Sequence, residues 1–567
     1  MMGWFEKHWK ISFIITLIFG TIFLFIQQGP NFLKSKIVSI FITLTKPFAT
    51  NRWVITVAES HQPYIQDWFS QFSKPYIWLM IIGSIILFYE IVKIASKKDT
   101  WKLTAVYTLF ILGFIFTRYS QNSLFNGETP ISIILYISSL ILFLLVLIYF
   151  YLRIYYKDKD LFEKLKDTEE SFIFILVWFV IMIVAARSAI RLLYIFAPIT
   201  TIIFAYLIYN LYKRVYKIKE KTIKIIIIAI IVIATFSLFF GFYKTTSEQA
   251  KYSGSVYNQQ WQIAMKWVRE NTQENAVFAH WWDYGYLVQT GANRATLSDG
   301  GNARGAINYF IGRHVLTAQN NTEALELLKA NEATHLLIIS DEIGKYPAFS
   351  SIGSDENYDR YSWIPTFGLS DQRETRNGLA YIYQSGTTLD EDLIYQGKLY
   401  PRRAASIGAF VIETQNINNS NQEGINFIQP YGILIYNGQQ IQVPINCLFF
   451  NNQELNFNNP EGIDACLRII PTISENQQNP LGALLYLSPR VKRTLFTRLY
   501  LFNQEDENLK LVYTDEGSMP LAMYQGRLIG PLKIWNISYP DNLNIPEEYY
   551  GIEFPNPEVN EVKSEYT

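Results

Sequence analysis

Long apolar runs in the first 245 residues constrain the fold of this chain more than any other feature. Seven runs stand out, and each is close to the ~20 residues that an α-helix needs to cross a bilayer. They lie at residues 11–27, 77–95, 102–117, 131–152, 171–187, 189–211 and 223–243. The chain is 50% hydrophobic but 17% charged, which is too apolar for an ordinary soluble protein and too charged for a wholly membrane-embedded one. The sequence therefore predicts a multi-pass helical membrane domain and a more polar part outside the bilayer.

Basic residues around the runs predict which loops face the cytoplasm, because Lys and Arg are enriched on that side. Lysines follow the second run, and a denser group of Lys and Arg separates the sixth run from the seventh. Lys7 and Lys10 precede the first run as in a signal sequence, but no small-residue cleavage site follows it. We therefore expect 1–27 to be a retained first transmembrane helix and 77–244 to hold six more. This arrangement places 28–76, and everything after residue 244, on the extracellular face of the cell membrane.

The more polar part alternates helical and strand-like patterns and then becomes rich in short strands. The patterns predict helices at Asn258–Asn271 and Thr322–Ala330, and strands at Ala276–Ala279 and His335–Ser340. We expect an external mixed α/β domain over 245–400, followed by an external β-rich accessory domain over 401–567.

Charge and cysteine content narrow the setting of the protein. The formal net charge is zero, so nothing in the composition indicates a nucleic-acid partner. Cys447 and Cys466 are the only cysteines, and both a disulfide and two buried free thiols remain open. Heavy use of Ile, Asn, Lys and Tyr is typical of an AT-rich genome, from which we expect an archaeal source.

A Trp-Trp-Asp-Tyr-Gly motif occupies residues 281–285, directly after the first predicted strand. Aromatic walls exclude water, the carboxylate of Asp283 accepts a hydrogen bond, and Gly285 lets the backbone of a bound molecule come close. These features predict a shallow binding pocket. The alternative is an aromatic cluster that fills a core.

Two further stretches carry candidate chemistry. Thr56-x-x-Glu59 lies in the predicted external loop, although a helix capping box has the same form. Arg187 and Arg191 lie in an apolar region that is too long for one helix, so the chain is expected to turn there at the external membrane surface. An arginine at the centre of a bilayer helix costs at least ~2.5 kcal/mol, and a guanidinium binds phosphate in a fork. We expect a lipid phosphate as partner; snorkelling to the headgroups is the alternative.

The motif at 281–285 resembles the WWDYG signature of oligosaccharyltransferase catalytic subunits, membrane glycosyltransferases of the GT-C type. In that family the motif grips the Ser or Thr two residues after the acceptor Asn. The resemblance therefore implies acceptor-binding roles for Trp281, Trp282, Asp283, Tyr284 and Gly285.

The other stretches are also similar to motifs of this family. Thr56-x-x-Glu59 is similar to the motif of its fifth external loop, which implies that Glu59 is a catalytic residue and a metal ligand. Arg191, and after it Arg187, match the arginine that holds the pyrophosphate of the lipid donor. The stretch from Asp341 to Lys345 resembles the D-x-x-K helix that completes the acceptor pocket.

The match to that helix is imperfect. The spacing from Asp341 to Lys345 is one residue longer than in the family, and Pro347 should disturb a helix. The resemblance implies that Lys345 lines the acceptor pocket, and a solvated lysine is the alternative.

The function that the resemblance implies is transfer of an oligosaccharide from a polyprenyl or dolichyl (pyro)phosphate to Asn in an Asn-X-Ser/Thr polypeptide, with Mg²⁺ or Mn²⁺ as cofactor. Family members carry D-x-D motifs in early external loops, whereas the first 58 residues here contain no Asp and only Glu6. One carboxylate does not anchor a metal that prefers several oxygen ligands.

We therefore expect the C-terminal portion of such an enzyme, with a separate N-terminal half that supplies the D-x-D motifs. The alternatives are a non-catalytic sequon-binding membrane module and another polyprenyl-phosphate-dependent sugar transferase. The second alternative would keep the arginines but have no use for an aromatic pocket that reads a hydroxyl group.

Overall fold

The computed structural model describes residues 52–551 except 167, 377, 416–425 and 475–476, together with scattered positions between 15 and 38. The chain divides into two compact units, a helical unit that ends at Ser253 and a mixed unit that begins at Gly254. The predicted first transmembrane helix, 1–27, lies largely outside the described residues.

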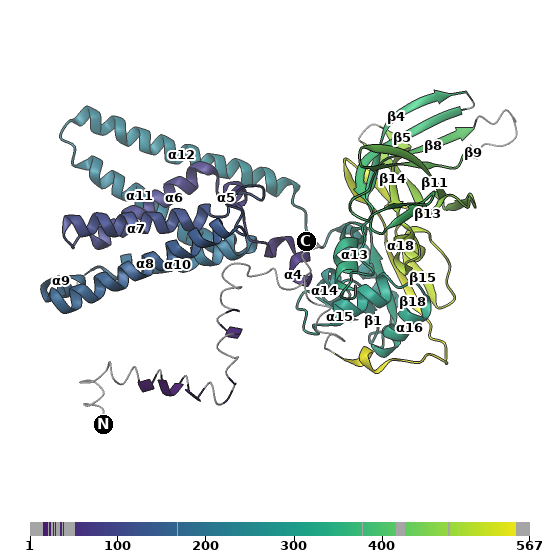
Figure 1. The fold of residues 1–567 in the computed structure, drawn as a ribbon, viewed down its shortest axis with the longest axis horizontal. Coiled ribbons are helices and arrows are strands. Elements are labelled where there is room, and N and C mark those ends of the chain that lie inside the picture. The colour runs from purple at the N-terminus through teal and green to yellow at the C-terminus, as the bar shows by residue number, and fades with distance from the viewer. Residues whose placement is uncertain are drawn as a thin grey trace. The chain divides into compact units, whose positions relative to one another are not determined.

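Six helices among the described residues are long and apolar enough to cross a membrane, and all belong to the helical unit. They are α6 (Lys74–Val92), α7 (Lys97–Phe116), α8 (Pro130–Lys157), α10 (Glu170–Ser188), α11 (Leu193–Tyr216) and α12 (Lys221–Tyr252) (Figure 1). They correspond to the second to seventh predicted runs with shifted ends, so the apolar pattern located each of these helices.

Aromatic packing holds this bundle together. Helix α6 packs against both α7 and α11, while α7 also contacts α8 and α11 also contacts α10 and α12. Phe88 stacks on Tyr107 with 4.3 Å between ring centroids, and Phe110 stacks on Phe143 at 4.7 Å. Because lipid tails are as apolar as these side chains, close ring packing of this kind is what favours helix association inside a bilayer.

Short elements join the ends of the long helices. They are α4 (Arg52–Thr56), η1 (Ala58–Ser60), α5 (Ile65–Phe72), α9 (Lys159–Lys166) and η2 (Ile190–Leu192). The segment after η1 is tied to η2, since the Ile190 N–H donates to the His61 carbonyl at 2.9 Å. The loop that carries Glu59 and the turn that carries Arg191 therefore lie at the same end of the bundle.

The mixed unit begins with the predicted alternation of helices and strands. Its elements are α13 (Gln259–Asn271), β1 (Val277–Ala279), η3 (Trp282–Tyr284), α14 (Gly285–Ala292), β2 (Ala295–Thr296), α15 (Ile307–Phe310), η4 (Ile311–Leu316), α16 (Asn321–Ala330), β3 (His335–Ile339) and α17 (Asp341–Ile352). The strands belong to a five-stranded sheet of order β15-β18-β3-β1-β2. Strand β1 runs parallel to β2 and β3, while β15 (Leu509–Thr514) and β18 (Leu532–Ile537) add antiparallel strands.

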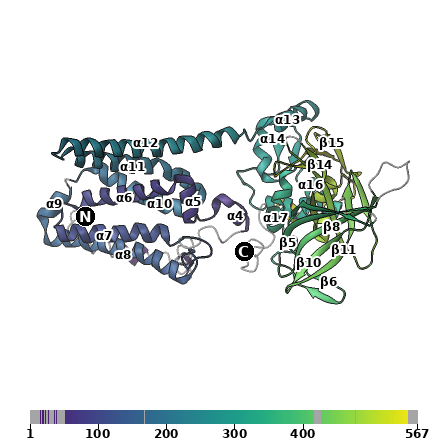
Figure 2. The same cartoon turned by 90° about the horizontal axis from the view of Figure 1, so that it is seen from above.

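A second sheet follows and closes on itself. It contains β4 (Thr366–Thr375), β5 (Gly378–Thr388), β8 (Ser406–Gln415), β9 (Asn426–Phe427), β10 (Tyr431–Tyr436), β11 (Gln439–Phe450), β12 (Gln453–Asn456), β13 (Ile463–Ile473), β14 (Gln478–Leu487), β16 (Ala522–Tyr524) and β17 (Arg527–Ile529). Strand β11 pairs with β13 as well as β10, so the path β11-β10-β8-β5-β4-β14-β13 forms a closed barrel (Figure 2). Inward residues such as Phe410, Leu467 and Leu484 fill its core.

The remaining elements are short. They are the hairpin β6 (Leu393–Tyr395) and β7 (Lys398–Tyr400), and the turns of helix α18 (Pro489–Lys492), η5 (Thr497–Leu501) and η6 (Glu547–Tyr550). Cys447 and Cys466 stand opposite each other on β11 and β13 and form a disulfide, so pairing is the alternative that the structure contains.

The structure corrects the predicted boundary at residue 400, because both sheets take strands from both sides of that position. Strands β4 and β5 precede it but belong to the barrel, whereas β15 and β18 follow it but complete the five-stranded sheet. The physical reason is that paired strands can lie far apart in the sequence. A local pattern of short strands does not show which strands will pair.

Candidate functional site

The aromatic motif forms the connection between β1 and α14. The side chain of Trp281 is 1% exposed, and its ring meets the edge of Phe349 in α17 at 5.8 Å. Tyr284 is also buried and stacks on Trp261 of α13 at 5.6 Å. Trp282 and Asp283, by contrast, are only partly buried. The core-filling alternative thus describes Trp281, Tyr284 and Gly285, while Trp282 and Asp283 remain accessible.

Helix α17 places Lys345 against the accessible carboxylate. The Lys345 Nζ lies 3.3 Å from Asp283 Oδ2 and donates to the Tyr284 hydroxyl at 3.3 Å. It also lies 4.7 Å from the centroid of the Tyr284 ring. The side chains of Asp283 and Lys345 are 27% and 33% exposed, so both groups can reach a bound molecule. Lys345 is thus ion-paired as well as partly exposed, and a pocket role for it stays a prediction.

Pro347 does not interrupt α17, contrary to the expectation from the sequence. The helix runs from Asp341 to Ile352 with Pro347 inside it. A proline removes only one backbone donor, and the helix is held by its buried face. On that face Tyr346 and Phe349 pack against each other at 4.8 Å and against Phe496 at 5.9 Å.

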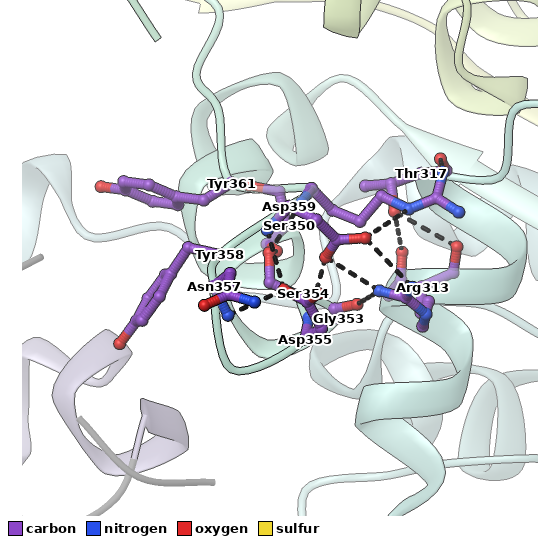
Figure 3. Close-up of polar contacts among 12 residues, drawn as sticks. Arg313, Thr317, Ser350, Gly353, Ser354, Asp355, Asn357, Tyr358, Asp359 and Tyr361 are labelled. Atoms are coloured by element: carbon purple, nitrogen blue, oxygen red, sulfur yellow. Dashed lines mark hydrogen bonds and ion pairs between the residues drawn. The ribbon is translucent and has the colours of Figure 1, made fainter. Parts of the chain in front are cut away.

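The end of α17 is fixed by a two-pronged ion pair. Arg313 of η4 donates from Nη1 and Nη2 to the two carboxylate oxygens of Asp359, at 2.9 and 3.0 Å, and from Nη1 to the Gly353 carbonyl at 3.1 Å (Figure 3). A Cβ on Gly353 would lie 2.4 Å from the backbone nitrogen of Arg313, so only glycine permits this approach of the two segments. The guanidinium thereby joins η4 to the chain that leaves α17.

Glu342 is a buried acid behind the motif that the sequence analysis missed. One carboxylate oxygen accepts from the Ile339 N–H at 2.7 Å, while the other is buried without a hydrogen-bond partner among the described residues. Burial raises the pKa of Glu342 to about 8, against the opposing influence of the Ile339 and Trp281 backbone N–H groups and of Lys345. A signal was present, since Glu342-x-x-Lys345 has the three-residue spacing that Asp341 lacks.

His280 and Gly285 shape the backbone on either side of the indoles. His280 is buried, and its Nδ1–H donates to the Trp281 carbonyl at 2.8 Å. Burial lowers the pKa of His280 to about 4, so the ring is neutral near pH 7. A Cβ on Gly285 would lie 2.4 Å from the Ser298 carbonyl oxygen and 2.6 Å from the Asp299 Cα. The close approach that requires glycine at position 285 is therefore to the chain itself.

The helical unit holds the remaining candidates. Glu59 is exposed on η1, and Arg191 is exposed on η2 at the same end of the bundle. Arg187 is buried, with its guanidinium carbon 4.4 Å from the centroid of the Tyr136 ring and 5.7 Å from that of Phe114. This burial contradicts the alternative in which Arg187 snorkels to lipid headgroups. Among the residues that the structure describes, no group of three or more His, Cys, Asp and Glu side chains is placed to hold a metal ion.

Comparison with known proteins gives a match around the aromatic motif. Residues 273–337, which include β1, the aromatic motif and most of β3, match the STT3/PglB/AglB core domain. This part of the chain is therefore similar to the core domain of oligosaccharyltransferase catalytic subunits. Asp283 lies inside the matched oligosaccharyltransferase segment, whereas Glu342 and Lys345 follow it.

Curated proteins that match part of this chain carry related names. Dolichyl-phosphooligosaccharide-protein glycotransferase 1 of Pyrococcus horikoshii is 28% identical over 203 residues, which make up 34% of this chain and 20% of that relative. The glycotransferase 1 of Pyrococcus furiosus is 33% identical over 99 residues, or 16% of this chain and 10% of that relative. The matches thus span a fifth or less of these relatives.

Among solved structures, the archaeal oligosaccharyltransferase AglB from Archaeoglobus fulgidus, in complex with an inhibitory peptide and a dolichol-phosphate, is 12% identical. The superposition covers 86% of this chain and 69% of that chain, with a TM-score of 0.37.

Proposed function

We propose that this chain takes part in protein N-glycosylation, in which an oligosaccharide passes from a polyprenyl (pyro)phosphate to Asn in Asn-X-Ser/Thr. The observation that carries the proposal is the accessible pair of Asp283 and Lys345 on rigid elements of the mixed unit. A carboxylate accepts a hydrogen bond from the hydroxyl of Ser or Thr. The half-exposed indole of Trp282 supplies an apolar surface beside it.

Each member of the motif has a distinct part in this proposal. Asp283 binds the acceptor hydroxyl, and Lys345 pairs with that carboxylate and lines the pocket. Trp282 contacts the acceptor directly. Trp281, Tyr284 and Gly285 are buried and position the others rather than touching the acceptor.

The helical unit is proposed to hold the lipid donor. Arg191 is exposed on η2, at the bundle end that also carries Glu59. A guanidinium binds two phosphate oxygens at once, which suits a pyrophosphate at the membrane surface. We assign the donor pyrophosphate first to Arg191 and second to Arg187, whose burial against Tyr136 leaves it the less accessible of the two.

A divalent metal fits this chain only in part. Mg²⁺ and Mn²⁺ prefer several oxygen ligands, and Glu59 offers one exposed carboxylate. Among the described residues it belongs to no group of three or more His, Cys, Asp and Glu side chains that could hold a metal ion. We propose that carboxylates of another polypeptide, an N-terminal half with D-x-D motifs, complete the metal site and that this chain needs that partner for activity.

The chain offers two supports for an extracellular mixed unit. Four candidate spans separate Glu59 from Arg191, and six separate it from Gly254. An even number of crossings returns a chain to the same side of the membrane, which supports placing all three on one side. A disulfide within the barrel is typical of an oxidising exterior rather than the cytoplasm.

A glycosylation assay with a labelled Asn-X-Thr peptide tests this proposal. It compares the purified chain, the chain mixed with membranes from its source, and the Asp283→Ala variant mixed with the same membranes. We expect product only from wild type with membranes. Product from the Asp283→Ala mixture at the wild-type rate would contradict the proposed role of the motif, and no product from any arm would favour a non-catalytic sequon-binding module.

A further inference from the structure

A cavity of about 530 Å³ opens on the outer face of the barrel in the mixed unit, where β11, β13 and β14 meet the segment before β16. Its walls include Phe449, Arg468, Pro471, Glu516 and Leu521. Cavities of roughly 300–1,000 Å³ are typical of small-molecule sites. The cavity shares no residue with the aromatic motif, so it stands apart from the proposed acceptor site.

Arg468 is the unusual member of this wall. It lies in β13 between Leu467 and Ile469, whose side chains point into the barrel core. Because side chains alternate along a strand, Arg468 points to the opposite face. There its guanidinium carbon lies 4.9 Å from the ring centroid of Phe449 on the paired strand β11.

The guanidinium of Arg468 is buried without enough partners. The residue is 6% exposed, and both Nε and Nη1 are buried with no hydrogen-bond partner in the part of the chain that the structure describes. A guanidinium cannot give up its proton at ordinary pH, so it cannot escape this cost by becoming neutral. Buried charges in proteins are normally paired and hydrogen-bonded, which indicates that something else satisfies this group.

The neighbouring charges leave Arg468 uncompensated. Glu516 lies near enough to influence Arg468 electrostatically, but it pairs with Lys533, whose Nζ is 2.9 Å from Glu516 Oε2. Lys533 is only 1% exposed and also donates to Asn503 Oδ1 at 2.5 Å. A second acid, Asp515, also lies near enough to influence Lys533. Both acids thus act on Lys533, while two N–H groups of Arg468 have no hydrogen-bond partner among the described residues.

We infer that this cavity binds a ligand through a carboxylate, with the guanidinium of Arg468 as its anchor. A carboxylate adds one negative charge beside Arg468, whereas a phosphate dianion adds two to a neighbourhood that already holds Glu516 and Asp515. The planar fork of a guanidinium matches a carboxylate with two parallel hydrogen bonds. Phe449 and Pro471 offer apolar surface to the body of the ligand. Acidic sugars and simple organic acids share this chemistry.

Binding of small anions to the purified full-length chain in detergent tests the inference. The probes are glucuronate, as a sugar acid, and benzoate, as an organic acid without a sugar. Glucose and inorganic phosphate serve as comparisons, and the ionic strength is held constant. Calorimetric titration measures affinity, and thermal unfolding measures stabilisation. We expect at least one of the two carboxylates to bind saturably. Glucose and phosphate should bind more weakly and stabilise the protein less.

Three variants test whether the carboxylate binds at Arg468. Arg468→Met should weaken carboxylate binding by about tenfold or more, because a hydrogen bond to a charged group is worth ~1.5–3 kcal/mol. Glu516→Gln, at a partly exposed residue, should strengthen binding because it removes the competing carboxylate. Arg373→Met, at an exposed arginine of the same barrel, is the matched control and should leave binding unchanged.

The inference fails on any of three results. One is no saturable binding of either carboxylate to wild type, and another is phosphate binding as tight as that of the carboxylates. The third is unchanged affinity in both Arg468→Met and Glu516→Gln. If Arg468→Met does not fold, the direction of the Glu516→Gln change decides, because weaker binding in that variant contradicts the proposed charge balance.

Discussion

Gly285, the glycine of the aromatic motif, leaves no room for an added methyl group. A Cβ there would lie 2.4 Å from the Ser298 carbonyl oxygen, and backbone on both sides would have to move. We expect Gly285→Ala to destabilise the mixed unit by about 1–3 kcal/mol, as overpacking does. Unfolding followed by tryptophan fluorescence measures the change.

Gly344→Ala is the matched control for that substitution. Gly344 lies within α17, and no atom lies within 4 Å of its ideal Cβ. Replacing an exposed helical glycine by alanine should stabilise the protein by about 0.5–1 kcal/mol. Equal effects of the two substitutions would contradict the packing described for Gly285.

Glu342 should make the stability of the mixed unit depend on pH. Burial raises its pKa from an ordinary value of 4.5 to about 8, so the folded protein holds the proton more tightly than the unfolded chain. This contribution to stability is fully present below 4.5 and is lost as the pH rises through about 8. The direction is opposite to that of a carboxylate held by a salt bridge.

Glu342→Gln tests this pH dependence. The amide oxygen can still accept from the Ile339 N–H, but the side chain no longer titrates. We expect the variant to lose less stability than wild type between about pH 5 and 9. Denaturant unfolding at several pH values gives the slopes, with Asp341→Asn at the neighbouring exposed position as control. Identical slopes in wild type and Glu342→Gln would show that Glu342 is not the titrating group.

At the scale of elements, the disulfide joins β11 and β13, the two strands whose pairing closes the barrel. Cys447 and Cys466 are 19 residues apart, and closing a loop of that length stabilises by about 3 kcal/mol in the chain-entropy account. We expect the double variant Cys447→Ser, Cys466→Ser to unfold at lower temperature than the oxidised protein. Thermal unfolding of the double variant, the oxidised wild type and the reduced wild type measures the difference. Coincident unfolding transitions would contradict a stabilising role for the disulfide.

Elements with a local signal were predictable from the sequence. The apolar runs located six long helices because a span needs about 20 consecutive apolar residues. Helix α13 followed from its amphipathic pattern with Asn258 as its N-cap. The barrel was not predictable, since its closure depends on β11 pairing with β13, and nothing local in either strand names its partner.

The site was predictable only where a motif names its residues. The motif pointed to Asp283, and the loose resemblance around 341–345 pointed to Lys345, which lies 3.3 Å from it. The same resemblance drew attention to Asp341, which is exposed, rather than to Glu342, which is buried. Burial depends on how α17 packs against the motif, and the sequence does not record that packing.

On the scale of the whole molecule, the two units are proposed to divide the work. The helical unit offers Glu59 and Arg191 at one end of a bundle of candidate membrane spans. The mixed unit offers Asp283 and Lys345 at the surface of a sheet completed by strands from the end of the chain. In this proposal the mixed unit recognises the acceptor. Substitutions there should weaken acceptor binding without weakening donor binding.

Equilibrium binding of acceptor peptides tests the central claim most directly, because it needs neither donor nor partner. Fluorescent Asn-X-Thr and Asn-X-Val peptides differ by one hydroxyl group at nearly constant shape. Wild type should prefer the Thr peptide by about tenfold or more, as expected for a hydrogen bond to a charged group. Asp283→Ala should bind both peptides equally, while Asp371→Ala, at an exposed acid of the barrel, should keep the preference. Equal binding by wild type, or a preference that survives Asp283→Ala, would contradict the account.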